Sequence, residues 1–189
     1  MKREVTSMRR LAVLTASIVF ALSSSVLLGS ASGSRTIKIL GTEHFVPNAL
    51  INANYRFSPG PLSVKSGESV TWANATNDGH TISIVPSVPA TVSDVFGCGA
   101  PGTVCAPILA CHFPQGFGPP VTVGCGNAAN GELKVVGDSV LVGCTGTPGC
   151  QVPIPIPSTV TLKITAPAGS HLLYMCVIHA WMQGEIVVS

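Results

Sequence analysis

Short stretches in which apolar and polar residues alternate run through the chain from residue 36 onward, and turn residues separate them. Alternation with a period of two is the pattern of a β-strand with one buried face. Many short strands with polar turns predict an all-β fold, an antiparallel sandwich or barrel, with Trp72 and Tyr174 as core aromatics. The predicted strands lie at 36–40, 61–65, 69–74, 80–85, 159–165, 170–176 and 185–189.

Between residues 86 and 157 the pattern gives way to a different composition. These 72 residues hold 11 of the 15 Pro, 12 of the 20 Gly and 6 of the 7 Cys, but only four charged residues. One pattern inside resembles a hairpin, 132–136 with 139–142 around a Gly137-Asp138 turn. We interpret 86–157 as a loop-rich insertion that cannot build a strong core alone and is stapled by disulfides.

Composition and charge narrow the class of protein. Hydrophobic residues make up 46% of the chain, enough to offset the ordering entropy that keeps polar chains disordered. The 20 Gly and 15 Pro disfavour a helical bundle. Beyond the first ten positions, 6 basic residues face 7 acidic ones, a net charge of about −1, and no basic run offers a footprint for nucleic acid.

The first 31 residues have the features of an export signal. A basic start leads into an apolar run from Leu11 to Leu28 and then to Gly29, Ser30 and Ala31. We expect cleavage after Ala31, which leaves a domain at 32–189 in the periplasm, secreted or on the outer face of the membrane. The alternative is an uncleaved anchor, since eighteen apolar residues can just span a bilayer, and only then would the protein contact a membrane.

The seven cysteines divide into six and one. Cys176 lies alone near the C-terminus, and the other six lie within 86–157. In an oxidising compartment this predicts three disulfides and one remaining thiol, either a functional thiolate or an inert buried group. Six cysteines allow 15 pairings, and a short Cys144–Cys150 loop is one candidate. The six are Cys98, Cys105, Cys111, Cys125, Cys144 and Cys150.

The residues after Cys176 favour the functional thiolate. Cys176, His179 and Met182 are spaced three apart across one tight loop, and His80 opens an apolar strand after a turn. A thiolate, two imidazoles and a thioether are a soft ligand set that suits copper. Two His and one Cys in a plane, with Met as a weak axial ligand, is the blue-copper electron-transfer arrangement.

These motifs resemble the cupredoxins of the plastocyanin, pseudoazurin and amicyanin kind. The resemblance covers FSPGPLSVKSGESVTWAN (57–74), DGHTISI (78–84) and YMCVIHAWMQGEIVV (174–188), in the expected order and with the short ligand loop of amicyanin. It implies an eight-stranded Greek-key β-sandwich with one copper ion at one end. It also implies that the Thr81 backbone N–H donates to the thiolate. The 96 positions from His80 to Cys176 exceed a minimal cupredoxin, and the insertion accounts for the excess.

The function that the ligand set predicts is one-electron transfer between redox partner proteins, without enzymatic activity or a small-molecule substrate. One alternative is a copper enzyme, but the remaining histidines are widely scattered and the chain has no G-x-S-x-G motif. Another is a copper storage or delivery module of the cell envelope. In the family that the motifs resemble, the C-terminal-loop His is the electron exit within an apolar patch. His179 matches it, with Trp181 and Ile178 as candidate docking residues.

Three other histidines are expected to play no part in the metal site. His112 follows Cys111, and we interpret the pair as a disulfide cysteine beside a surface histidine. His171 lies five residues before Cys176, so strand alternation directs it to the opposite face, where it is structural or solvent-facing. His44 is placed in a polar N-terminal loop.

Overall fold

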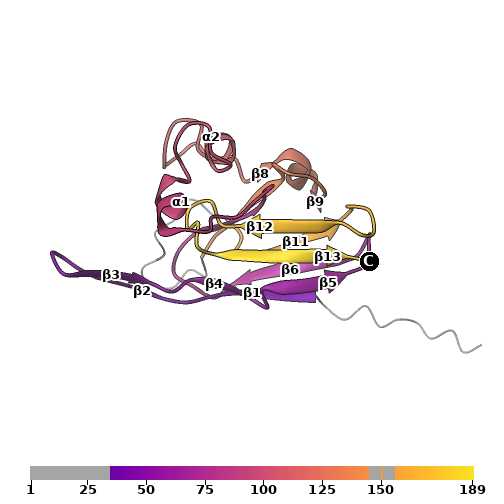
Figure 1. The fold of residues 1–189 in the computed structure, drawn as a ribbon, viewed down its shortest axis with the longest axis horizontal. Coiled ribbons are helices and arrows are strands. Elements are labelled where there is room, and N and C mark those ends of the chain that lie inside the picture. The colour runs from indigo at the N-terminus through magenta and orange to yellow at the C-terminus, as the bar shows by residue number, and fades with distance from the viewer. Residues whose placement is uncertain (1–34, 145–149, 151–155) are drawn as a thin grey trace, which may run out of the picture. The chain divides into compact units, whose positions relative to one another are not determined.

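The computed structural model describes residues 35–144, 150 and 156–189, all within one compact unit, Ser32–Ser189. The predicted export signal or anchor at 1–31 lies outside the described residues. Within the described ranges, no helix is both long and apolar enough to cross a membrane. Most of the regular structure is β-strand, as the alternating pattern predicts (Figure 1).

The elements of the described part are short. The strands are β1 (Arg35–Leu40), β2 (Glu43–Val46), β3 (Leu50–Ala53), β4 (Arg56–Ser58), β5 (Pro61–Val64), β6 (Ser69–Asn74), β7 (His80–Ile84), β8 (Gly124–Cys125), β9 (Glu132–Leu133), β10 (Ser139–Val142), β11 (Thr159–Ile164), β12 (His171–Met175) and β13 (Gln183–Val188). The helices are α1 (Val92–Gly97), α2 (Ala106–His112) and the 3-10 turn η1 (Gly126–Asn130).

Two sheets form a sandwich. One has the order β4-β1-β6-β11-β9 and the other β5-β13-β12-β7-β10-β8. Strands β4 and β5 are two halves of one strand that changes sheets, since β4 pairs with β1 and β5 pairs with β13. Counting them together, β1, β4/β5, β6, β7 and β10 to β13 are the eight strands of the expected Greek-key sandwich. The seven strands predicted from the sequence are confirmed to within two residues at each end.

The core lies between the two sheets and is built by the alternation. In β6, Val70, Trp72 and Asn74 point inward and are buried, while their neighbours are more exposed. Trp72 and Tyr174 are fully buried and meet edge-to-face with ring centroids 6.0 Å apart, which confirms both as core aromatics. Burying one large apolar side chain contributes about 1.5–3 kcal/mol, so this layer holds the two sheets together.

The hairpin predicted at 132–136 and 139–142 is wrong. Strand β9 pairs with β11 in the five-stranded sheet, and β10 pairs with β7 in the other sheet. A turn does form, because the Asp138 carboxylate accepts hydrogen bonds from the backbone N–H groups of Lys134 and Val135. It carries the chain from one sheet to the other, and it also makes β10 a strand of the sandwich rather than part of an added loop.

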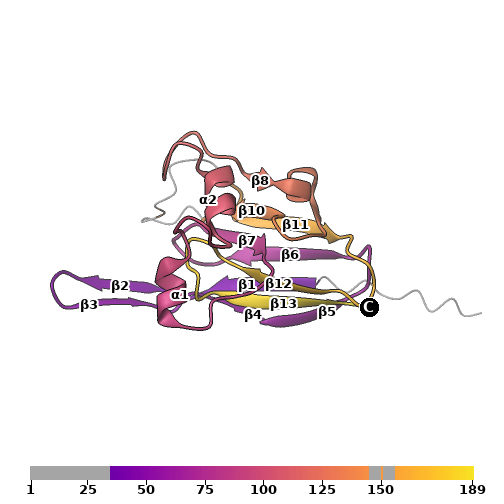
Figure 2. The same ribbon diagram turned by 45° about the horizontal axis from the view of Figure 1, so that its top comes forward.

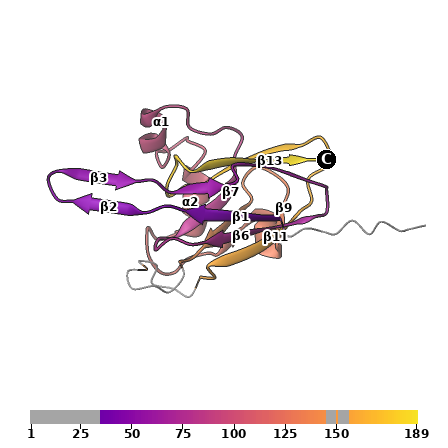
Figure 3. The same cartoon turned by 90° about the horizontal axis from the view of Figure 1, so that it is seen from below.

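The segment around His44 is not the polar loop that the sequence suggested. Strands β2 and β3 form a separate two-stranded sheet, in which Phe45 pairs with Ile51. Asn48 adopts a left-handed conformation (φ 60°) in the turn between them. Figure 3 shows this hairpin extending beyond the sheets. Phe45 and Ile51 are 60% and 73% exposed, so the hairpin lacks the buried face of the sandwich strands.

The rest of 86–157 is stapled by disulfides, as predicted. All six cysteines pair, as Cys98–Cys105, Cys111–Cys125 and Cys144–Cys150, and Cys176 stays free and buried. The short helices α1 and α2 were not predicted. Helix α1 begins with a capping box between Thr91 and Asp94, and α2 has a proline in its first turn.

Candidate metal centre

Two neighbouring strands of the six-stranded sheet bring the candidate ligands together. His80 is the first residue of β7, and Cys176 follows the last residue of β12. The two strands are antiparallel with Met175 opposite Ser83, so the start of β7 lies beside the end of β12. The loop from β12 to β13 contains His179 and Met182. It is closed by hydrogen bonds from Cys176 N to Met182 O (3.0 Å) and from Met182 N to His179 O (2.8 Å).

Three of these side chains form a tight triangle. The Nδ1 atoms of His80 and His179 are 3.2 Å apart. Cys176 Sγ lies 3.9 Å from Nδ1 of His80 and 3.8 Å from Nδ1 of His179. All three residues are buried, and so is Met182, which belongs to the same core cluster as Cys176. The fold therefore brings together the residues that the sequence predicted as metal ligands.

The triangle has the dimensions of a metal site. A point in its plane lies roughly 2.1 Å from all three ligand atoms, which matches bonds of about 2.0–2.3 Å from a first-row metal to imidazole and thiolate. Buried polar atoms that face one another without a cation between them are costly. Two imidazoles, a thiolate and a nearby thioether suit copper, and the cluster is a site for one copper ion.

The surroundings of the Cys176 sulfur favour its thiolate form. It accepts hydrogen bonds from the backbone N–H groups of Thr81 and His179, each 3.3 Å away. Burial raises the pKa of Cys176, but hydrogen bonds and positive charge from His179 and His80 outweigh it and lower the pKa to about 5. The Thr81 contact is the one that the family resemblance implied. The Thr81 hydroxyl also accepts from the backbone N–H of Val177 (2.8 Å), which ties β7 to the ligand loop.

His80 is oriented by Thr76, which was predicted only as a turn residue, and by Asn74, which was predicted only as the end of a strand. Its Nε2 lies 2.8 Å from the Thr76 hydroxyl, so Nδ1 is left to face the cluster. Thr76 is in turn fixed by Asn74, whose Oδ1 accepts from the backbone N–H and the hydroxyl of Thr76, both at 2.8 Å. The signal was present in the run NATNDGH, in which polar residues precede the ligand.

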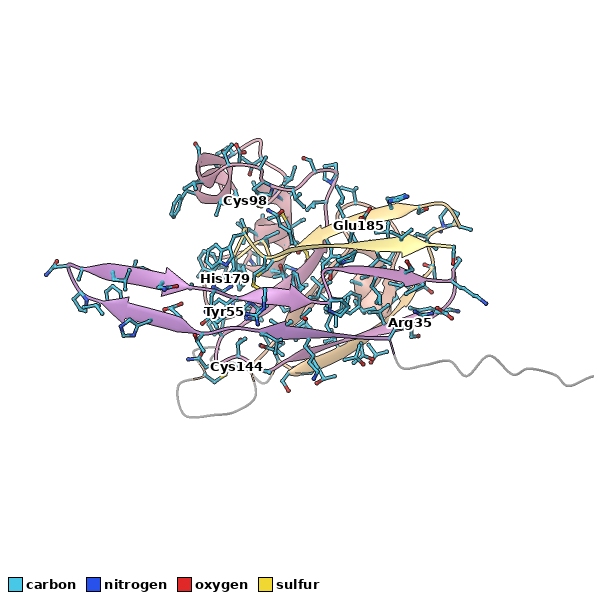
Figure 4. The ribbon with its side chains drawn as sticks, turned by 60° about the horizontal axis from the view of Figure 1, so that its bottom comes forward. Arg35, Tyr55, Cys98, Cys144, His179 and Glu185 are labelled. Carbon is cyan, nitrogen blue, oxygen red and sulfur yellow. A yellow bond between two sulfur atoms is a disulfide. The ribbon has the colours of Figure 1, made fainter. Side chains whose placement is uncertain are left out.

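His179 has two partners that the sequence did not identify. Its Nε2 lies 3.3 Å from the Asp78 carboxylate. Burial lowers the pKa of His179, but hydrogen bonds to Asp78 and Cys176 outweigh it and raise the pKa to about 9. The Tyr55 ring packs against His179 and His80, with centroids 5.0 Å from each. Figure 4 shows Tyr55 beside His179. Tyr55 and Asp78 therefore cover one side of the cluster.

The two candidate docking residues differ in exposure. The Trp181 ring is 41% exposed and meets His179 edge-on, with centroids 5.2 Å apart. It lines a shallow apolar pocket with Val92 and Phe96 of α1, beside the ligand loop. Ile178 is partly buried and packs against the main core.

The remaining histidines lie outside the cluster. His171 is exposed and paired with Glu185 at 2.7 Å, in line with the solvent-facing alternative. Cys111 is in a disulfide, but His112 is fully buried, so its placement on the surface was wrong. The disulfide ties α2 to β8. Both ring nitrogens of the buried His112 have hydrogen-bond partners inside the fold. Nothing in the local sequence indicated those partners.

No protein-family model and no curated protein matches the sequence. Solved structures similar to this chain include a mutant amicyanin in the reduced state, with 15% identity, 85% of this chain and 87% of that chain covered, and a TM-score of 0.37. A purple cupredoxin from Nitrosopumilus maritimus has 16% identity, coverage of 82% and 100%, and a TM-score of 0.38. A mutant fern plastocyanin has 19% identity, coverage of 82% and 99%, and a TM-score of 0.37. Likenesses this distant assign no function to the chain.

Proposed function

We propose that this protein is a blue copper protein that carries single electrons between redox partner proteins outside the cytoplasm. The observation that supports it most is the triangle of His80, Cys176 and His179, with dimensions that fit one metal ion bound by all three. His80, Cys176 and His179 would hold the ion, and the thioether of Met182, buried in the same core cluster as Cys176, would be a fourth and weaker ligand. Copper in such a site supplies the one-electron Cu(I)/Cu(II) couple.

Several features favour a carrier over an enzyme. The four candidate ligands are all buried protein side chains, whereas a catalytic metal keeps a position open for substrate. Multicopper catalysis needs further histidine clusters. In the described ranges, His112 and His171 are each engaged by other partners, and one group of candidate ligands is found.

The rigidity of the cluster favours a carrier over a delivery protein. Cys176 Sγ accepts two backbone hydrogen bonds, and the Thr81 hydroxyl holds the loop at Val177. Fixed ligands limit the rearrangement between the two copper oxidation states, which is what an electron carrier needs. A protein that hands its metal to a partner needs ligands that can be released, and these hydrogen bonds oppose such release.

The site is tested by adding Cu(II) to the purified 32–189 protein and recording the visible spectrum. We expect an intense blue band that Cys176→Ser abolishes, because thiolate-to-copper charge transfer produces it. His80→Ala should remove or strongly weaken the band, while His171→Ala, a matched change at an exposed histidine, should leave it intact. Reversible bleaching by a reductant supports the carrier. Tight Cu(I) binding without redox cycling would favour delivery, and an unchanged band in Cys176→Ser would refute the site.

We further propose that partners dock on the apolar surface beside His179, at Trp181 and Ile178. A net charge of about −1 gives little long-range steering, so docking should depend on apolar contact. Trp181→Asp should slow electron exchange in stopped-flow mixing and leave the visible spectrum nearly unchanged. Val136→Asp is the control, since Val136 is also exposed and lies just before the turn that contacts the far end of β7. A perturbed spectrum in Trp181→Asp would instead give Trp181 a structural role.

The cellular location that we propose is extracytoplasmic. Three disulfides indicate an oxidising compartment. The 1–31 segment would act as a cleaved signal, or as an anchor if it is retained. N-terminal sequencing of the protein made in a secreting host separates the two outcomes, because cleavage gives a chain that begins at Ser32.

A further inference from the structure

A continuous line of buried polar side chains joins helix α2 to the copper cluster. His112 Nε2 lies 2.7 Å from Ser139 Oγ on β10. Ser139 Oγ lies 2.7 Å from Ser83 Oγ on β7, and Ser83 Oγ lies 2.9 Å from the hydroxyl of Thr81. That hydroxyl accepts from the backbone N–H of Val177, the residue after Cys176. The four side chains that form the line are all fully buried.

The outer end of the line is fixed by a disulfide. Nδ1 of His112 donates to the Thr122 carbonyl at 2.6 Å, and Cys125 Sγ lies 3.6 Å from the same nitrogen. The Cys111–Cys125 disulfide ties α2 to β8, and Cys125 is the register partner of Ser139 on β10. The covalent link therefore holds the imidazole above Ser139, and Figure 2 shows α2 beside β8 and β10.

Stability alone does not explain these residues. Strand β10 is buried along its whole length, and apolar side chains at 83 and 139 would fill the space without needing partners. A buried hydroxyl that loses its partner costs about 1–3 kcal/mol, and a partly satisfied network is worse than an apolar core. Each hydroxyl has a single proton to donate, so the three hydroxyls and the imidazole must be oriented together.

We propose that His112 is a positioning residue for the copper site and acts through Ser139, Ser83 and Thr81. The imidazole fixes the orientation of the hydroxyl line, and the line fixes the Thr81 hydroxyl that holds Val177. The same residue, Thr81, donates its backbone N–H to the Cys176 sulfur, and hydrogen bonds to a ligand sulfur tune the reduction potential. The disulfide-stapled segment would thereby set the potential from a distance. This inference depends on the copper site proposed above.

Two substitutions separate this role from simple packing. An asparagine side chain reaches about as far as Nδ1 of histidine and a glutamine side chain about as far as Nε2. His112→Asn therefore keeps the hydrogen bond to the Thr122 carbonyl and loses the one to Ser139. His112→Gln keeps the hydrogen bond to Ser139 and loses the one to the Thr122 carbonyl. We expect His112→Asn and Ser83→Ala to change the ratio of oxidised to reduced protein at a fixed potential by about three- to tenfold, where tenfold is about 59 mV for one electron. For comparison, mutating a group in direct contact with a metal ligand changes metal affinity or activity by about 10- to 100-fold.

His112→Gln should stay close to the wild-type potential, as should the matched control His171→Gln at an exposed histidine. In the apoprotein, the Val177 amide hydrogen should exchange at least about tenfold faster in His112→Asn and Ser83→Ala than in the wild type. Equal shifts in His112→Asn and His112→Gln would reduce His112 to a packing role. An unchanged potential and unchanged Val177 exchange in both His112→Asn and Ser83→Ala would overturn the proposal. If the wild type forms no blue site, the proposed function fails, and the exchange measurement still tests the line of hydrogen bonds.

Discussion

Replacing Asn74 should strongly destabilise the end of the sandwich that holds the metal cluster, although the change in side-chain volume is small. Asn74 is 3% exposed and uses its whole side-chain amide. Its Nδ2 donates to the carbonyls of Asp78 (2.7 Å) and Gly143 (2.8 Å), and its Oδ1 accepts from the N–H and hydroxyl of Thr76. It therefore holds the 74–80 loop, which presents His80, against the end of β10.

The expected loss in the free energy of unfolding depends on which groups lose their hydrogen-bond partners in Asn74→Ala. The Thr76 hydroxyl and the Asp78 carbonyl still contact each other at 3.3 Å. The Thr76 N–H and the Gly143 carbonyl lose the asparagine, and a buried group without a partner costs about 1–3 kcal/mol. We expect a loss of about 4 kcal/mol in the free energy of unfolding. That loss lowers Tm by about 8–16 °C at the 2–4 °C per kcal/mol typical of a domain of this size.

The assay is denaturant unfolding of the apoprotein, followed by a copper titration. Asn74→Asp keeps the acceptor but turns a carboxylate toward two carbonyls, so it should be at least as destabilising as Asn74→Ala at neutral pH. Asn52→Ala, at an exposed position in β3, should stay within about 0.5 kcal/mol of the wild type. Copper affinity should fall by about 10- to 100-fold in both Asn74 variants, because Thr76 no longer fixes His80. If Asn74→Ala unfolds like Asn52→Ala, the loop is held by something other than this amide.

Further predictions concern three other parts of the fold. Gly184→Ala would place a Cβ against the fully buried ring of Tyr174. Overpacking of this kind should lower stability in urea unfolding by about 1–3 kcal/mol, and a neutral result would contradict the packing described. Replacing Cys111 and Cys125 by serine opens a disulfide with a sequence separation of 14 and should lower stability by about 3 kcal/mol, measured by calorimetry against the wild type. Met182→Leu should keep copper but raise the reduction potential in voltammetry, because a weak donor to Cu(II) is lost, and loss of copper would exclude an axial role.

The sequence alone determined seven of the strands and the candidate ligands. Alternation of apolar and polar residues is a local property, since a strand with one buried face needs it whatever lies opposite. The spacing of Cys176, His179 and Met182 is also local, because one short loop carries all three. For the same reason, the division of the cysteines into six that pair and Cys176 could be made without coordinates, and the structure confirms it.

Only the tertiary structure decided what meets across the sheets. The turn at Gly137-Asp138 has the local pattern of a hairpin, yet β9 and β10 join different sheets, because each pairs with a strand far away in the sequence. His112 is polar and follows a cysteine, which locally favours the surface. It is buried because a disulfide and a register between β8 and β10 place Ser139 beneath it. Partners such as these are set by long-range packing. The two members of each pair lie too far apart in the sequence for a local pattern to connect them.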